Sequence, residues 1–405
     1  MKKLLLSAAA FAVVAVSAVT VTPTTSEAIP AFARQTGAAC LQCHHLTFPT
    51  LSAFGRSFKQ GAFTDVGELA LIEDDALSIT SVLNMSIVLR TKFINTAQTG
   101  QASVKTTQLP ADTVLLFGGR VGSNTGAFIE YEAAFANYQL INSWDAGDGK
   151  VGFSIFNSGF GDTFGIEVGS TYGQHGGLFG AKGLTAMHNI DGNAKASVGG
   201  TGGVAVFFAN DIVTASVSGV TGSAALGVEN GWKLAPSARV FAVQDFGGME
   251  FGLGFNITSG STGNAGTRAA LGLNPAITSI KMKKWGVDFQ VQGEMGDTGF
   301  DFYADYASAA ASTATELNLY NSGTTGTLKG YSFRGDVKPL HNVIIGAGYG
   351  SLKDNVTKTT RWQIAAEYEI YQNFVAALIY NSRKVKVGGV STTTNTTTID
   401  IEALM

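Results

Sequence analysis

The feature that most constrains the fold is a strict alternation of apolar and polar side chains. It recurs in segments of about ten residues from about residue 76 to the C-terminus. The clearest segments are residues 127–135, 285–294, 300–306 and 361–370. In residues 285–294, one face carries Trp285, Val287, Phe289 and Val291, and the other carries Gly286, Asp288, Gln290, Gln292 and Glu294. Because successive side chains of a strand point to opposite faces of a sheet, these segments are predicted to be β-strands.

Two architectures use such strands: a soluble sandwich with its apolar face inward, and a membrane barrel with its apolar face toward lipid. Strands of about ten residues are long enough for a tilted crossing of a bilayer. The chain has 51 glycines in 405 residues and only 14% charged residues. About 330 residues at roughly 20 per strand and turn give about 16 strands, an even number in the porin range. The sequence therefore favours an all-β protein, an antiparallel outer-membrane β-barrel of about 16 strands, over a soluble sandwich.

Turn composition suggests which loops share a rim of this barrel. The short turn Gly296-Asp297-Thr298-Gly299 suits one rim, whereas long Gly/Ser/Thr segments at 259–267 and 391–398 suit the outer rim as loops. The last strand is expected to alternate Ile399, Ile401, Ala403 and Met405.

The N-terminus has the pattern of a secretory signal peptide. Lys2 and Lys3 precede an apolar run, and Ser26-Glu27-Ala28 offers small residues at a cleavage site. A membrane anchor is the alternative, but the run is short for a spanning helix. We therefore expect a signal peptide at 1–28, a separate segment at 29–75 that holds both cysteines, and a porin-like β-barrel at 76–405. The net charge of −3 gives no indication of nucleic-acid binding.

The chain's two cysteines lie in the run Cys40-Leu41-Gln42-Cys43-His44. In this motif two thiols bond covalently to one haem, and the following histidine is the proximal iron ligand. A zinc site would need two more ligands, and a thioredoxin-type dithiol would lie in a βαβ unit, which the surrounding sequence does not indicate. The sequence predicts one haem c bound by Cys40, Cys43 and His44, with His44 as the metal ligand.

The ligand on the other side of the iron is left open by the sequence. His45 is a poor choice because its neighbour already occupies the opposite side. An open sixth position is also possible, which would favour ligand binding over simple electron transfer. Met85 alternates with Ile87 and Leu89 and so suits a lipid-facing strand better. The candidates are Met85, Met187, His175, His188 and His341.

The residues around the motif resemble a known family. The matching run is Ala31-Phe32-Ala33-Arg34-Gln35-Thr36-Gly37, then the cysteine motif, then Pro49, Leu51 and Phe54-Gly55-Arg56-Ser57-Phe58-Lys59. It is similar to the N-terminal signature of fused outer-membrane monohaem cytochrome–porins of iron-oxidising bacteria. The match covers about 30 residues densely, and the barrel matches only in length, alternation and strand count. The resemblance implies haem residues at Cys40, Cys43 and His44. Packing around the haem is the default role for Arg34, Gln35, Pro49, Phe54, Arg56 and Phe58, and Arg34 or Arg56 could pair with a haem propionate.

The resemblance also implies a function. Single electrons would pass from an extracellular donor, ferrous iron, to a periplasmic electron carrier across the outer membrane. If the chain is an enzyme, it is an iron(II)-oxidising cytochrome oxidoreductase. Inward carboxylates could concentrate cations, or could simply pair with lysines and arginines; they are Glu130, Glu132, Asp288, Glu294, Asp301, Asp305, Glu367 and Glu369. The alternatives are a conduit for another donor or acceptor, and a diffusion porin with a haem plug or sensor.

Overall fold

The computed structural model describes residues 30–46, 50–65, 70–73, 78–80, 84–132, 135–157, 164–169, 184–193, 201–222, 232–263, 269, 272–371 and 373–405. The expected signal peptide, Pro49 and His175 lie outside these residues, as does the side chain of Glu132. Among the described residues, no helix is both long and apolar enough to cross a membrane.

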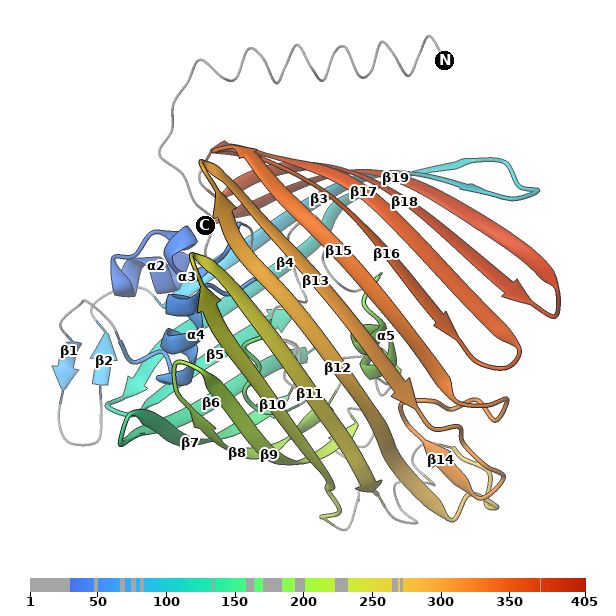
Figure 1. Cartoon of the computed structure of the whole chain (residues 1–405), viewed down its shortest axis with the longest axis horizontal. Helices are drawn as coiled ribbons and strands as arrows, with labels where there is room; N and C mark the ends of the chain where they lie inside the picture. Colours follow the sequence, from blue (N-terminus) through green and yellow to red (C-terminus); the bar gives the residue numbers. More distant parts are fainter. Residues whose placement is uncertain are drawn as a thin grey trace, which may run out of the picture.

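Sixteen of the described strands form a closed antiparallel barrel, which confirms the predicted fold class (Figure 1). The barrel closes where the last strand pairs with β3. Its strands are β3 (Met85–Gln98), β4 (Val104–Gly122), β5 (Thr125–Glu132), β6 (Phe135–Ala146), β7 (Gly149–Asn157), β8 (Thr201–Ala209), β9 (Val213–Gly222), β10 (Ala235–Phe246), β11 (Met249–Ser261), β12 (Ser279–Met295), β13 (Thr298–Ala309), β15 (Leu328–Leu340), β16 (Val343–Lys353), β17 (Thr357–Tyr371), β18 (Phe374–Val387) and β19 (Val390–Leu404).

Three short strands lie outside this pattern. β1 (Ala70–Glu73) and β2 (Ser78–Thr80) pair with each other in a separate sheet. β14 (Glu316–Asn318) belongs to the connection between β13 and β15 and pairs in parallel with the start of β12. The main strands β13 and β15 still pair directly, so the barrel wall is continuous there.

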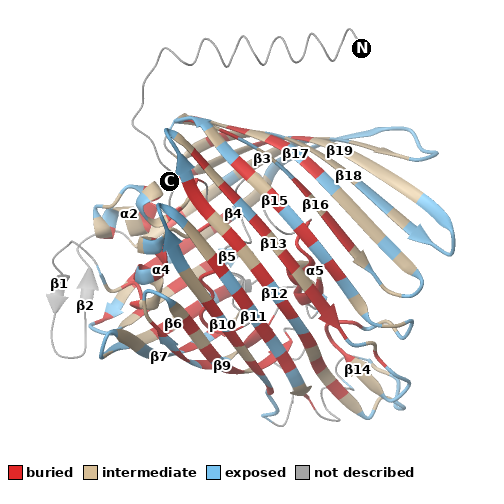
Figure 2. Ribbon diagram, in the orientation of Figure 1, coloured by how far each residue is buried: buried red, intermediate tan, exposed pale blue. Residues whose placement is uncertain are grey.

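The alternation seen in the sequence becomes an inside and an outside in the barrel. On β12, Trp285 is 42% exposed on the outer surface, whereas Gln290 is 0% exposed inside. On β17, Ile364 faces outward at 52% and Glu367 faces inward at 6%. The same stripes of exposed and buried residues run along most of the wall (Figure 2). A closed barrel with an apolar exterior and a polar interior is suited to lipid, because it leaves no unpaired strand edge in the hydrocarbon. The chain is therefore an outer-membrane barrel, as predicted.

At the rim that holds the C-terminus, all connections between barrel strands are short, of two or three residues. The turn at Gly296 and Asp297 joins β12 to β13 as expected, and two further short turns join β4 to β5 and β10 to β11. The longer connections, between β7 and β8 and between β13 and β15, leave from the opposite rim. In outer-membrane barrels the short turns face the periplasm. The rim that carries the C-terminus is thus the periplasmic rim.

One predicted loop is wrong. The Thr-rich stretch 391–398 lies inside β19, where each residue pairs with β18, and its last five residues also pair with β3. Threonine is β-branched and favours strands, so repeated threonines that look like a low-complexity loop can form a regular strand between two neighbours. The other predicted loop, 259–267, begins with three residues that belong to β11.

Part of the long connection between β7 and β8 folds back into the barrel. Its helix α5 (Ala186–Gly192) lies on the inner side of the wall (Figure 1). The backbone N–H of Met187 donates to Asp305 Oδ2 at 2.6 Å, and the ammonium of Lys284 bonds to Asp191. An apolar core forms around this helix from Phe164, Met187, Ile190, Met282 and Tyr320. The connection therefore fills part of the lumen.

Candidate functional site

Three short helices precede the barrel and lie at its periplasmic rim (Figure 1). They are α2 (Pro30–Thr36), α3 (Cys40–Cys43) and α4 (Ala53–Gln60). The cysteine motif is α3 itself, followed by His44 as its C-terminal cap. The stretch from α2 through α4 to Phe63 is called the N-terminal plug below, because it contacts inward-facing residues of the wall.

The cysteine motif forms a single helical turn. Residues three apart on one helical turn face the same side, so Cys40 and Cys43 present their thiols together. They are not joined in a disulfide. The helical turn closes with a hydrogen bond from the His44 N–H to the Cys40 carbonyl at 2.9 Å, which places the histidine directly after the second thiol.

The ring of His44 is oriented by the backbone of Thr50. His44 Nδ1 lies 3.1 Å from the Thr50 carbonyl oxygen. Because a carbonyl only accepts hydrogen bonds, Nδ1 must carry the proton, and Nε2 keeps its lone pair for a metal. Burial lowers the pKa of His44 to about 4, so the imidazole is neutral at physiological pH. A second-sphere carbonyl that fixes the tautomer is typical of metal-binding histidines.

Cys43 does not have the environment of a reactive thiolate. Burial raises its pKa to about 11, so the thiol is protonated at neutral pH. Thiol–disulfide chemistry needs an accessible thiolate. Within the described residues, no group of three or more His, Cys, Asp or Glu side chains is arranged to hold a metal ion. The burial of Cys43 therefore disfavours a redox-active dithiol.

Helix α4 packs directly against the motif. The Ser52 hydroxyl caps its first turn by accepting from the Gly55 N–H at 3.2 Å, and the Ser52 N–H donates to the Cys43 carbonyl at 3.0 Å. A Cβ at position 55 would overlap the Cys43 carbonyl oxygen. Glycine is required here because α4 and α3 approach at backbone distance. The Phe-Gly-Arg run of the sequence is therefore partly a packing motif.

Phenylalanines fix the N-terminal plug to the wall. The ring of Phe32 stacks on Phe63 at 5.0 Å and meets Phe58 edge-on at 5.4 Å. It also lies 5.7 Å from Phe128 of β5 and against Gly118 of β4. Aromatic groups of this size supply much of the burial that holds a small segment in place.

Polar contacts of the plug reach strands around much of the barrel. Arg34 donates to the Met85 carbonyl on β3, and Gln60 donates to Thr214 on β9 at 2.8 Å. Arg56 pairs with Glu250 on β11, and His45 Nε2 bonds to the Phe300 carbonyl on β13 at 2.9 Å. Because these partners lie on widely separated strands, the plug extends across the periplasmic mouth. Both arginines considered for a haem propionate have protein partners.

The structure separates the candidates for the second iron ligand. Ser86 faces inward and accepts from the Ala31 N–H, so Met85 beside it belongs to the outward face. Met187 and His188 lie on α5. Met187 of α5 bonds to Asp305 of β13, whereas His45, next to the motif, bonds to Phe300 of the same strand. These two positions are five residues apart, which separates α5 from the motif by roughly 17 Å at about 3.3 Å per residue. The fifth candidate, His341, lies in the turn between β15 and β16, at the same rim as the plug.

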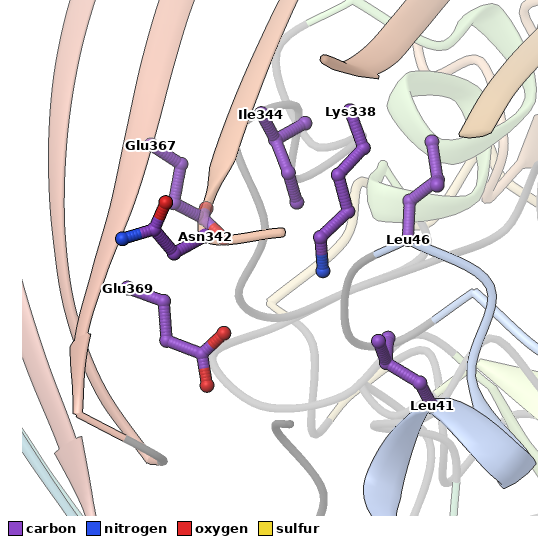
Figure 3. Close-up of a pocket in the computed structure, with 7 residues that line it drawn as sticks. All are labelled: Leu41, Leu46, Lys338, Asn342, Ile344, Glu367 and Glu369. Atoms are coloured by element: carbon purple, nitrogen blue, oxygen red, sulfur yellow. The ribbon is translucent and has the colours of Figure 1, made fainter. Parts of the chain in front are cut away.

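A small, partly open cavity lies between the motif and the wall (Figure 3). Leu41, from the motif, and Leu46 line one side of it. The wall contributes one lysine, one amide, one isoleucine and two carboxylates, namely Lys338, Asn342, Ile344, Glu367 and Glu369. Sequence reasoning missed Lys338 and Thr50: Lys338 lies almost 300 positions from the motif, and Thr50 acts through its backbone.

The inward carboxylates differ in their bonding partners and in their exposure. Asp288 forms a bidentate pair with Arg239 at 2.6 and 2.9 Å, and Arg239 also meets Glu167 at 2.6 Å. Asp305 accepts from α5 and from Ser332, and Asp301 from Tyr303 at 3.1 Å. Glu130 is buried, whereas Glu294 is exposed near the rim. Most of these carboxylates have protein partners, which is what an ordinary polar lumen would show. Glu367 and Glu369 differ because they face the cavity beside the motif.

Comparisons with known proteins found outer-membrane barrels. OmpT of Vibrio cholerae, expressed in the outer membrane, is 14% identical, with 83% of this chain and 100% of that chain covered and a TM-score of 0.43. An anion-selective porin from Comamonas acidovorans is 10% identical, covering 79% and 98%, with a TM-score of 0.48. OccK8 of Pseudomonas aeruginosa is 8% identical, covering 80% and 98%, with a TM-score of 0.44. No protein-family model and no curated protein matches. Likenesses this distant carry none of the functional argument.

Proposed function

We propose that this chain is an outer-membrane c-type cytochrome fused to a porin-like barrel, which moves single electrons from an extracellular donor to periplasmic carriers. Ferrous iron is the proposed donor. The observation that carries the proposal is the position of the cysteine–histidine motif. It lies on a helical turn in the periplasmic mouth, with His44 oriented by the Thr50 carbonyl and a cavity beside Leu41.

The residues present fit one covalently attached haem. Cys40 and Cys43 would hold its vinyl-derived carbons through thioethers, and His44 Nε2 would bind the iron. Bound there, a haem supplies a one-electron redox couple. The protein's own contribution is to keep the His44 ring in one tautomer and to fix the motif within the mouth through the Phe32 and Phe58 cluster.

The location of the motif supports transfer across the membrane. The hydrocarbon layer is about 30 Å thick, which is too wide for one small redox centre to bridge unaided. Because the motif lies at the periplasmic mouth, a carrier in the periplasm can approach it more closely than an extracellular donor can. The donor must enter from the opposite rim through the lumen, past the α5 segment.

The direct test is haem attachment in the full chain. Expressed with a c-type maturation system, the wild-type protein is expected to keep its haem on a denaturing gel stained for haem peroxidase activity. Cys40→Ala/Cys43→Ala is expected to lose that band while the barrel still folds, as judged by its heat-modifiable mobility. A haem-free wild-type chain would contradict the cofactor assignment.

Anaerobic mixing tests the donor. Oxidised holoprotein is expected to show the spectrum of the reduced haem after addition of Fe(II). An unchanged spectrum would remove ferrous iron as the donor, and a reduction potential well below that of the iron couple would do the same. The diffusion-porin alternative predicts instead that solute flux persists unchanged in Cys40→Ala/Cys43→Ala.

A further inference from the structure

The cavity beside the haem motif holds an unusual charge arrangement. Glu367 and Glu369 are two residues apart on β17, so both side chains face inward. They are 6% and 8% exposed, respectively. Across the cavity, the ammonium of Lys338 points into the same space, opposite Leu41 (Figure 3). Two carboxylates and one ammonium therefore surround a small space in contact with the motif.

One carboxylate oxygen in this space has unmet bonding capacity. Glu369 Oε1 is buried and, among the described residues, accepts no hydrogen bond. Figure 3 shows the Glu369 carboxylate aimed into the cavity and not toward the wall. A buried carboxylate oxygen without a donor is costly, which indicates that a ligand or ordered water fills the space.

We infer that this cavity binds a divalent first-row metal ion, with Glu367 and Glu369 as its protein ligands beside the haem motif. Carboxylates are suitable ligands for hard divalent cations, which commonly retain several waters and bind through only one or two protein carboxylates. A haem propionate fits less well because it would add a third negative charge to a space that holds one lysine. The inference rests on the proposed function, since it assigns ferrous iron, the donor, a place to bind.

Lys338 makes the site a weak one. Its ammonium repels a cation in the same cavity while neutralising part of the carboxylate charge when the site is empty. Weak binding suits a substrate that changes charge from +2 to +3 and must then leave. Removal of the Lys338 ammonium should therefore tighten metal binding, whereas removal of a carboxylate should weaken it.

The test uses Mn(II) as a redox-silent probe on the detergent-solubilised holoprotein, with binding followed by electron paramagnetic resonance. Glu369→Gln is expected to weaken Mn(II) binding by about tenfold or more, because it removes one of only two charged ligands. Lys338→Met is expected to tighten binding several-fold. The control is Glu316→Gln, which removes the same charge from a carboxylate paired with Lys281 and Lys283 near the opposite rim.

Unchanged Mn(II) affinity in both Glu369→Gln and Lys338→Met would overturn the site. An equal loss in Glu316→Gln would also overturn it, since general charge would then explain the binding. Because Mn(II) binding needs no electron transfer, the two proposals can fail separately. If Mn(II) responds as expected but Fe(II) does not reduce the haem, the metal site stands and the proposed donor fails.

Discussion

The arrangement of Cys40, Cys43 and His44 depends on two residues outside the motif. The Thr50 carbonyl fixes the His44 ring, and Gly55 lets α4 lie against the Cys43 carbonyl. Neither group is chemically reactive. Their effect is to hold the two thiols and the imidazole in one arrangement before any cofactor arrives, which reduces the ordering cost of binding.

Gly55→Ala should therefore disturb the site without touching a reactive group. The new Cβ would overlap the Cys43 carbonyl, and forcing the helices apart is expected to cost about 1–3 kcal/mol. The measurement is the ratio of haem absorbance to protein, which should fall below that of the wild type. Gly192→Ala is the matched control, because its Cβ would meet no atom within 4 Å. Equal haem content in the two variants would show that the helix contact is unimportant.

At the scale of elements, α5 is held in the lumen by a buried ion pair. Lys284 bonds to Asp191, and its ammonium also lies 4.9 Å from the centre of the Phe164 ring and 4.8 Å from that of Tyr320. Removing one partner of such a pair leaves a buried charge, which is more damaging than the pair's net contribution to stability suggests. The ion pair therefore anchors α5 to the barrel wall.

Lys284→Met is expected to release α5 from the wall. The loss of the ammonium should cost about 3–5 kcal/mol locally, enough to populate states with the helix displaced. Conductance in planar bilayers should rise and become noisier than in the wild type. Lys150→Met breaks only the surface pair with Asp145 and should change nothing. Identical conductance in all three proteins would mean that α5 does not limit the lumen.

At the scale of the whole molecule, the orientation of the barrel decides which compartment meets the haem motif. The plug and the C-terminus share the rim at which the strands are joined only by short turns, and that rim is periplasmic in this class of barrel. The haem motif would then face periplasmic carriers directly, whereas an extracellular donor would reach it only through the lumen.

Single cysteines outside the haem motif can test this orientation. Asp297→Cys lies in a short turn at the plug's rim, and Gln101→Cys lies in an exposed turn at the opposite rim. A membrane-impermeant maleimide added to intact cells is expected to label Gln101→Cys and not Asp297→Cys, and to label both after the outer membrane is permeabilised. Labelling of Asp297→Cys alone on intact cells would invert the orientation and place the haem motif at the cell surface.

Properties that depend only on neighbouring residues could be predicted from the sequence. Alternation with period two assigns Trp285 and Asp288 to opposite faces of the sheet, whatever the position of the strand in the fold. The positions of the strands, their two faces and the approximate strand count therefore followed from the sequence. The spacing of Cys40, Cys43 and His44 likewise needs only one helical turn to be chemically meaningful. Local composition failed at 391–398, where threonines that resemble a loop form part of β19 between two partner strands.

Which side chains lie close together in the lumen depends on how the barrel closes. Barrel closure joins residues more than 300 positions apart, as the pair of Arg90 and Asp400 shows. The same closure brings Lys338 and Glu369 to the haem motif and carries the motif into the periplasmic mouth. The partners of the inward carboxylates follow from strand register, which depends on hydrogen bonding between distant segments. No local pattern encodes that register, so the cavity could be found only once the barrel was closed.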